Sequence, residues 1–579
     1  MKHVSSGTGL PYIALSYVWG GNHKPDLLLV NGVSVNITES LDAALRSQVI
    51  LDYSSKGVPV WVDAICIDQE NIQERNTEVL RMRKIYAQSL ETICWLGKSA
   101  GSSNQAFDFL ATLATNSDSK PTEQQRIGLC QLFSRDWWLR VWTIQEAVVP
   151  AALRVACGNC HIKVSDHLLS SLHKAIMGLK NETAFSPSFH LSDQSLRRLE
   201  SLNSLRPTWF NNCSRGIPLD LLTLLVASRH ALATDPRDKV FGLLALTPES
   251  HSLISRPNYR LAKREVYSQL VVAWITHYNS MDIVCHAGTA DATRDLPSWV
   301  PDWSDGKSSV SFCSASWYAE NKPVTRQVLI HASIPPSFSY DLSRMTIWAY
   351  ELDKIQCVAE YGGSNGSKAC ITHRDANARV TRYDGTVMTF SALLRTVCGG
   401  QLSESLWASL DTIEFCRALH GILQDQGLNQ TAASTSETDK YIRAWFHNNS
   451  RFKVGNVTIG ELVSQLPSTR SESEEAPRNM YKAMQAFREK FVKVTRGRLL
   501  FTTATGYLGI SRQSVMPGDF AFLVPDCSAP LIVRQTGQMF KLVGDSYIHS
   551  NKGEPSMYGH WDAPKSIGEF TELKRIVLN

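Results

Sequence analysis

The chain has 579 residues, more than a single hydrophobic core usually serves, so we expect about two to four structural units. Apolar residues make up 43% of the chain and charged residues 20%, a balance that excludes an intrinsically disordered protein. The 59 basic and 54 acidic residues leave a formal net charge of only +5 and form no long basic run, so we expect no nucleic-acid partner.

No segment of the sequence has the features of a signal peptide or of a membrane span. Residues 1–10 are polar and rich in Gly and Ser, and the most apolar runs, at 221–227 and 270–275, are much shorter than a bilayer-spanning helix. The 13 scattered cysteines are typical of reduced thiols rather than of a disulfide framework. We therefore predict a cytoplasmic protein without a membrane span.

Strand-like and helix-like segments alternate over the first 165 residues. Short apolar runs predict buried strands at 12–18, 58–67 and 92–96. Apolar residues at helical spacing predict helices that begin at the capping residues Thr38, Asn71, Thr122 and Asp136, with another at 107–114. Asn31-Gly32 predicts the tight turn of a hairpin. This alternation is typical of a doubly wound parallel sheet, so we predict an α/β domain over residues 1–165.

The remainder of the chain divides into three predicted parts. Helical spacing at 218–247 and 264–278 predicts a mostly helical region over 166–310. Residues 311–490 predict a mixed α/β region whose polar stretches, 431–440 and 467–477, are candidate mobile loops. In 491–579, short apolar runs separated by turn signals predict a small antiparallel β module, a barrel or a sandwich.

Three blocks in the first quarter of the chain have polar residues where apolar runs end. They read YIALSYVWG at 12–20, VWVDAICIDQ at 60–69 and WWLRVWTIQE at 137–146. In an open α/β sheet such strand ends converge on one crevice that binds ligands. We therefore predict a shared site with Glu146 as the catalytic residue. The predicted ligand-binding residues are Ser16, Tyr17, Trp19, Gly20, Asp68, Gln69, Arg140 and Trp142.

Several of these residues also have simpler interpretations. Asp63 lies within the predicted strand 58–67, and Asp68, five residues later, lies where this strand ends. If the strand stays regular to its end, the two face opposite sides, and Asp68 is also suited to helix capping. Tyr17 and Trp19 are equally suited to filling core volume. A carboxyl group among aromatic residues, such as Glu146, can have a raised pKa and can stabilise a developing cation, but it can also simply anchor its helix.

The three blocks, in this order and spacing, resemble the signature motifs of the fungal heterokaryon incompatibility (HET) domain. Residues 235–244 resemble a segment that often follows this domain, and 517–519 and 543–549 resemble the closing segment of long family members. Family members usually carry a leading segment before the first motif, so we expect an N-terminal strand to be missing here. The resemblance implies an effector of nonself recognition that triggers programmed cell death, acting with an unknown protein partner or by self-association.

The second and third blocks are also similar to a strand and a Glu-bearing helix of Toll/interleukin-receptor-like (TIR) domains, which implies a TIR/flavodoxin-like sheet. In enzymatic TIR domains such a Glu supports cleavage of the nicotinamide–ribose bond of NAD. The resemblance therefore implies that Glu146 holds a ribose hydroxyl and stabilises an oxocarbenium-like transition state, with NAD as a substrate and no cofactor. A non-enzymatic signalling scaffold and a HET fold recruited to small-molecule metabolism remain open alternatives.

Cys157-Gly158-Asn159-Cys160-His161 has the spacing of a haem-attachment motif. The flanking residues, however, favour a hairpin with a tight turn, and haem attachment needs export, for which the chain shows no signal. No second ligand pair at a suitable spacing accompanies the two cysteines, so a zinc site is not supported. We therefore predict no metal.

Overall fold

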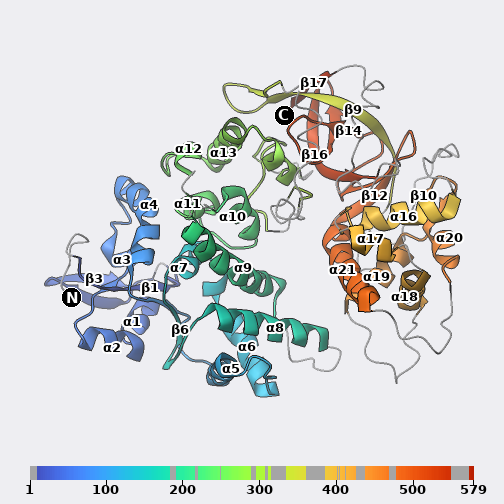
Figure 1. The fold of residues 1–579 in the computed structure, drawn as a ribbon. Helices are drawn as coiled ribbons and strands as arrows, with labels where there is room; N and C mark the ends of the chain where they lie inside the picture. Colours follow the sequence, from blue (N-terminus) through green and yellow to red (C-terminus); the bar gives the residue numbers. More distant parts are fainter. Residues whose placement is uncertain are drawn as a thin grey trace. The chain divides into compact units, whose positions relative to one another are not determined.

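The computed structural model describes residues 9–21, 23–182, 191–215, 219–247, 250–288, 295–306, 311–313, 334–359, 385–400, 402, 404–410, 413–424, 437–467, 478–549 and 573–579. The chain divides into two compact units, 1–266 with 303–307 and 267–302 with 308–579 (Figure 1). We describe each unit by itself.

The first unit is built on a five-stranded mixed sheet. Its strands are β1 (Ile13–Tyr17), β4 (Val60–Trp61), β5 (Thr92–Trp95), β6 (Leu153–Cys157) and β7 (Cys160–Lys163). Their spatial order is β4-β1-β5-β6-β7, in which the first four strands are parallel and β7 is antiparallel to β6. In chain order this is 2-1-3-4-5, an order found in doubly wound α/β domains. The α/β domain is thus confirmed, but its sheet is mixed rather than wholly parallel. The likeness to TIR or flavodoxin folds stays a prediction.

Local sequence signals determine several features of this unit. The hairpin of β2 (Asp26–Val30) and β3 (Val33–Ile37) turns at Asn31 and Gly32, whose φ angles of 52° and 84° are those the predicted tight turn requires. Thr38, Asn71 and Thr122 cap α1 (Glu39–Leu45), α4 (Ile72–Gln88) and α6 (Glu123–Phe133) through side-chain bonds to backbone N–H groups. Further helices of this unit are α2 (Gln48–Ser55), α5 (Ser103–Thr115), α8 (Asp166–Glu182), α9 (Asp193–Arg215), α10 (Leu221–Ala227), α11 (Asp238–Leu244) and α12 (Ser250–Leu253). Most residues of α13 (Lys263–Tyr278) belong to the second unit.

The predicted strand 58–67 is wrong beyond Trp61. Only Val60 and Trp61 pair with β1, and the chain then forms the short helix α3 (Asp63–Cys66). Because β4 is an edge strand, its outer backbone groups have no neighbouring strand within the sheet, and a helical turn satisfies N–H groups that a longer strand would leave unpaired. Asp63 and Asp68 therefore do not lie on one strand.

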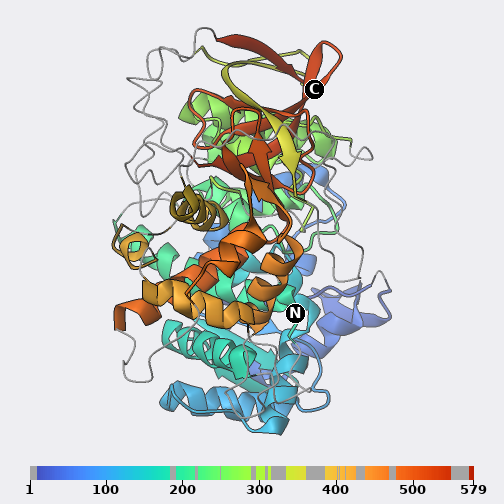
Figure 2. The ribbon, with the colours of Figure 1, turned by 90° about the vertical axis from the view of Figure 1, so that its right-hand side faces the viewer.

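The second unit is built on an antiparallel sheet. Its strands are β8 (Ser337–Phe338), β9 (Met345–Val358), β12 (Arg498–Thr503), β13 (Leu508–Arg512), β14 (Phe520–Leu523), β15 (Leu531–Thr536), β16 (Met539–Ile548) and β17 (Lys574–Leu578). Pairing runs β12-β13-β16-β15-β14-β9, and β9 pairs again with β12, so six strands close into a barrel. The antiparallel C-terminal module is confirmed. The long curved strand β9, which lies beside the red C-terminal strands in Figures 1 and 2, is contributed from the predicted region 311–490.

Helices accompany the barrel in the second unit. They are α16 (Gly385–Val397), α17 (Glu404–Leu410), α18 (Ile413–Gln424), α19 (Glu437–Asn448), α20 (Ile459–Ser464) and α21 (Arg478–Thr495), with a small sheet of β10 (Lys453–Val454) and β11 (Val457–Thr458). The predicted loop 431–440 is wrong for 437–440, which begin α19, and its residues 431–436 lie outside the described residues. The predicted loop 467–477 also lies outside them, except for Pro467.

Candidate functional site

The alternation of side chains along β1 assigns Ser16 and Tyr17 to different surroundings. Ile13, Leu15 and Tyr17 belong to the core cluster that also contains residues of α1 and α2. Ser16 has the opposite orientation, and its hydroxyl donates a short hydrogen bond to Oε2 of Glu146 in α7 (Thr143–Val148). The same hydroxyl oxygen accepts a hydrogen bond of 2.7 Å from the indole Nε1 of Trp137. Ser16 thus links the first block to the third.

Glu146 is a buried carboxyl group, with only 4% of its surface exposed. Burial raises its pKa to about 7, although Arg140, the hydrogen bond from Ser16 and Arg198 all favour the ionised form. Arg198 is completely buried and donates from Nη2 to Oγ1 of Thr143 at 2.7 Å. Burial also lowers the pKa of Arg198, to about 10. Nε and Nη1 of Arg198 have no hydrogen-bond partner among the described residues. The cluster therefore contains a carboxyl and a guanidinium that are both largely removed from water.

The second block joins the cluster through Asp63, which the sequence analysis did not assign to the site. Oδ2 of Asp63 accepts a hydrogen bond of 2.9 Å from Nε1 of Trp19, and its Oδ1 accepts one of 2.7 Å from the backbone N–H of Ala64. Burial raises the pKa of Asp63. The charge of Arg140, which donates to the carbonyl oxygen of Tyr17 at 2.6 Å, favours the ionised forms of both Asp63 and Glu146. Asp63 is thus the residue through which the second block contributes a half-buried carboxyl group.

Three predicted residues of this end of the sheet have local roles. Asp68 is exposed, and its Oδ1 accepts from the backbone N–H of Glu70 while its own N–H donates to Glu74. Gln69 donates from Nε2 to the carbonyl oxygen of Asp63 at 3.2 Å. Gly20 is exposed at a turn with a φ of 79°, a left-handed conformation that suits glycine. Within the described residues, neither the Asp68 nor the Gln69 side chain is hydrogen-bonded to Glu146.

The helix predicted from Asp136 through Glu146 is interrupted. The 3-10 helix η1 (Asp136–Leu139) ends, and α7 begins only at Thr143. Between them the chain pairs with Leu232, whose N–H donates to Leu139 and whose carbonyl accepts from Val141 at 2.8 Å. This extended link orients Arg140 toward β1, whereas a continuous helix would present Arg140 and Glu146 nearly two turns apart.

Trp142 contacts α11 rather than the Glu146 cluster. Its Nε1 donates to Oδ2 of Asp238 at 3.0 Å, and Oδ1 of Asp238 accepts from the hydroxyl of Tyr259 at 2.5 Å. The neighbouring Gln145 donates to the carbonyl oxygen of Gly242 at 2.5 Å. Residues 235–244 therefore connect the third block, through these hydrogen bonds, to the helices that follow the sheet.

Two further features of the first unit are the hairpin at Cys157–Cys160 and an apolar cavity. Cys157 and Cys160 form the ends of the β6–β7 hairpin, with Gly158 at a φ of 57°, as the hairpin interpretation predicts. A cavity beside Trp137 and Ala147 is lined by apolar side chains, with Arg206 its one charged residue, and it does not include Trp19, Asp68 or Glu146.

None of the helices in the described parts of the chain is long and apolar enough to span a membrane.

Comparison with known proteins identifies the domain that carries this cluster. The family model "Heterokaryon incompatibility protein (HET)" matches residues 12–146, from the first block to the last. The chain is 23% identical over 633 residues to "Heterokaryon incompatibility protein 6, OR allele" of Neurospora crassa, an alignment that covers 93% of this chain and 88% of that protein. No solved structure shows a significant match. The chain therefore contains a HET domain at residues 12–146.

Proposed function

We propose that this chain is an effector of fungal nonself recognition that triggers programmed cell death from its HET domain. Its similarity to a heterokaryon incompatibility protein extends along 93% of the chain, which supports a role of the same kind. The observation that carries the proposal is the link between the three blocks. Ser16 of the first block hydrogen-bonds to Glu146 of the third, and the charge of Asp63 in the second block raises the pKa of Glu146. We infer that the protein acts in the cytoplasm, with a protein partner or a second copy of itself.

The chemistry that this cluster supports is cleavage of the nicotinamide–ribose bond of NAD. The bond from ribose C1′ to the nicotinamide nitrogen breaks, and its electron pair stays with nicotinamide. Water then adds to C1′ and releases a proton, which yields ADP-ribose. An ionised Glu146 would hold a ribose hydroxyl and stabilise the positive charge that develops on the ribose.

The burial of Glu146 has a consequence for this mechanism. With 4% of its surface exposed and its Oε2 bonded to Ser16, Glu146 can touch a substrate only after the cluster opens. The described state would then be the resting state of the effector, and the trigger would act by loosening the contact between β1 and α7. A lethal enzyme needs such a resting state in its own cell.

A non-enzymatic scaffold is the second candidate, and the same burial favours it. The hydrogen bonds Trp137–Ser16–Glu146 join η1, β1 and α7 and so contribute to the fold irrespective of any ligand. In that case assembly with a partner or a second copy would transmit the signal, and Glu146 would matter only for stability.

Expression of the full-length chain in a fungal host separates the two candidates. We expect the wild type to reduce both cellular NAD and viability. Glu146→Gln keeps the size of the side chain and an acceptor oxygen for Ser16 but removes the negative charge, so both losses should disappear. Asp136→Asn, the same chemical change at an exposed position of η1, should behave as the wild type.

The outcomes distinguish the proposals when the amounts and thermal stabilities of the three proteins are matched. Cell death with unchanged NAD in the wild type would eliminate the enzymatic mechanism and leave assembly as the explanation. NAD loss that persists in Glu146→Gln would show that another residue carries the reaction. Full viability of cells that express the wild type would contradict the effector role itself.

A further inference from the structure

Three thiols and one carboxyl group from distant parts of the sequence meet inside the second unit. Asp282 and Cys285 lie in the 3-10 helix η2 (Asp282–His286), Cys313 lies in the described segment 311–313, and Cys527 follows β14. All four are buried, with exposed fractions of 4%, 0%, 2% and 4%. No local pattern of the sequence pairs them, because Cys285 and Cys527 alone are 242 positions apart.

Three of these four groups lie as close together as the ligands of a metal site, and the fourth, Cys527, lies next to one of them. A carboxylate oxygen of Asp282 and the Sγ atoms of Cys285 and Cys313 all lie within 4.8 Å of one another. Sγ of Cys527 is 3.3 Å from Sγ of Cys285. Tetrahedral zinc, with Zn–S bonds of about 2.3 Å, holds its thiolate sulfurs about 3.8 Å apart, so small side-chain shifts would complete the coordination. We propose that Cys285, Cys313, Cys527 and Asp282 bind one structural zinc ion.

The chemistry of the four groups favours zinc over the harder cations. Thiolate sulfur is a ligand for zinc, copper(I) and iron–sulfur clusters rather than for magnesium or calcium, and a site with four protein ligands leaves no position for a substrate. Zinc binds cysteine as the thiolate, so a bound zinc ion would replace the protons of the three thiols. The Cys527 thiol donates to the carbonyl oxygen of Ala529 at 3.2 Å, a bond that coordination would replace.

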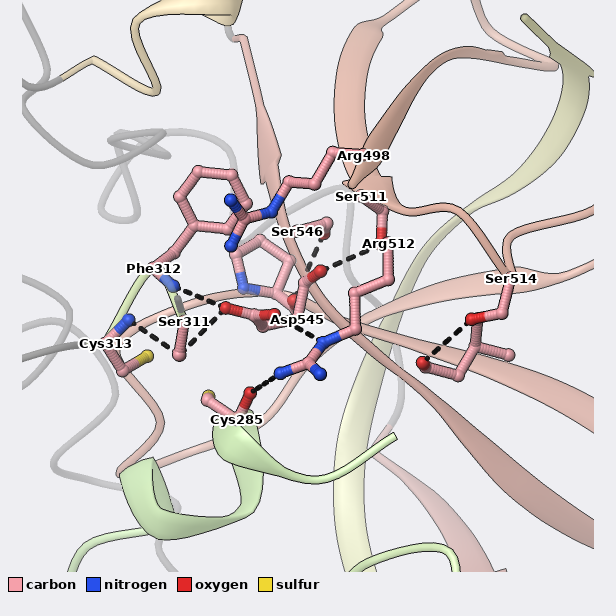
Figure 3. A network of polar contacts seen from close by, with 12 residues as sticks. Cys285, Ser311, Phe312, Cys313, Arg498, Ser511, Arg512, Ser514, Asp545 and Ser546 are labelled. Atoms are coloured by element: carbon pink, nitrogen blue, oxygen red, sulfur yellow. Dashed lines mark hydrogen bonds and ion pairs between the residues drawn. The ribbon is translucent and has the colours of Figure 1, made fainter. Parts of the chain in front are cut away.

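A buried ion pair positions two of the thiols (Figure 3). Arg512 pairs with Asp545 at 3.3 Å and donates from Nη2 to the carbonyl oxygen of Cys285 at 2.9 Å. Oδ2 of Asp545 accepts from the N–H of Phe312 at 2.5 Å and from the hydroxyl of Ser311 at 2.8 Å. Ser311 Oγ accepts in turn from the N–H of Cys313 at 3.0 Å. The Arg512–Asp545 pair therefore holds the backbone of both cysteines, as outer-shell groups do around metal ligands.

Other hydrogen bonds position Asp282 and the chain beside Cys527. Oδ1 of Asp282 accepts from the N–H of Ser528 at 2.6 Å, and Oδ2 accepts from its hydroxyl at 2.8 Å. The adjacent Met281 donates its N–H to the carbonyl oxygen of Asp526 at 2.7 Å. A zinc ion here would cross-link η2, the segment 311–313 and the turn after β14, and so would stabilise the barrel by closing long loops.

Metal analysis of the purified full-length chain, expressed with added zinc, tests the proposal. We expect about one zinc per chain in the wild type and almost none in Cys313→Ser or Cys527→Ser. Cys357→Ser, at a half-buried cysteine of β9 in the same unit, should retain the metal. Cobalt(II) added to the metal-free wild type should produce the thiolate-to-cobalt charge-transfer band and the intense visible bands of a tetrahedral site.

The wild type provides a test even if the cysteine variants fail to fold. A chelator should then remove the zinc and lower the melting temperature of the wild type, and added zinc should restore it. A folded wild type that contains no zinc and binds no cobalt would overturn the proposal. A Cys285–Cys527 disulfide found by mass spectrometry, or iron in place of zinc, would overturn it as well.

Discussion

Glu146 accepts a hydrogen bond from Ser16 and lies where the charges of Arg140 and Arg198 both favour its ionised form. Burial nevertheless raises the pKa of Glu146. The free energy that the carboxylate loses when its hydration is removed exceeds the stabilisation that the two cations provide. The pKa of about 7 means that the charge of this group changes near neutral pH. A small opening of the cluster would rehydrate the carboxyl group and favour the ionised form that the proposed reaction needs.

The raised pKa predicts how pH affects stability through this residue. Between its ordinary value of 4.5 and about 7, the folded protein binds a proton that the unfolded chain releases. Its contribution to stability is therefore complete below pH 4.5 and is lost as the pH rises through 7. Gln does not titrate, so the Glu146→Gln variant does not lose this contribution. The unfolding free energy of the variant minus that of the wild type should therefore rise by about 2 to 3 kcal/mol from pH 5 to pH 8.

Denaturant unfolding of both proteins across this pH range measures the effect. Asp136→Asn is the control, since an exposed carboxylate should give a nearly constant difference from the wild type. A constant difference for Glu146→Gln as well would show that Glu146 ionises normally in the folded protein.

At the scale of elements, α7 is held from two directions. Glu146 connects it to β1, while Trp142 and Gln145 connect its beginning to Asp238 and Gly242 of α11. A Cβ added to Gly242 would lie 3.6 Å from the Trp142 ring, so the indole packs directly against the α11 backbone. The third block is thus positioned by contacts with two segments that are distant from it in the sequence.

Asp238→Ala should destabilise the first unit. The change leaves the Trp142 indole N–H and the Tyr259 hydroxyl without their acceptor, which we expect to reduce the unfolding free energy by about 2 to 3 kcal/mol. Asp42→Ala breaks an exposed i,i+4 pair with Arg46 and should reduce it by less than about 0.5 kcal/mol. Urea unfolding followed by tryptophan fluorescence compares the two, and equal effects would show that Asp238 is not a structural anchor.

At the scale of the whole molecule, the barrel depends on strands that are far apart in the sequence. β9 pairs with β12 and β14, more than 130 positions later, and it bends where the register shifts at Ala521 and Phe522. Without β9, β12 and β14 would each lose a neighbour and expose an open sheet edge. The predicted module 491–579 therefore includes most strands of the barrel but not the one that closes it.

A fragment of residues 491–579 should not fold, whereas residues 267–579, which include β9, should. We expect the shorter fragment to aggregate or to show poor amide dispersion by NMR, and the longer one to unfold cooperatively. A well-dispersed spectrum and a cooperative transition for 491–579 would mean that β9 is dispensable for the barrel.

The sequence by itself determined those features that depend on neighbours in the chain. The Asn31-Gly32 turn and the caps Thr38, Asn71 and Thr122 were predictable because their hydrogen bonds and dihedral angles involve residues only a few positions apart. The HET domain was predictable because its three blocks are continuous stretches of sequence.

Only the tertiary structure decided where strands end and which side chains meet. β4 stops at Trp61 because it is an edge strand, and the helix predicted from Asp136 breaks because Val141 pairs with Leu232. Asp63 lies close enough to Glu146 for its charge to affect the pKa of Glu146. The buried thiols of Cys285, Cys313 and Cys527 also lie near one another. In both cases the packing brings together segments that no local sequence pattern relates. The physical reason is that burial and charge pairing depend on distance in space, which the spacing of residues along a chain does not specify.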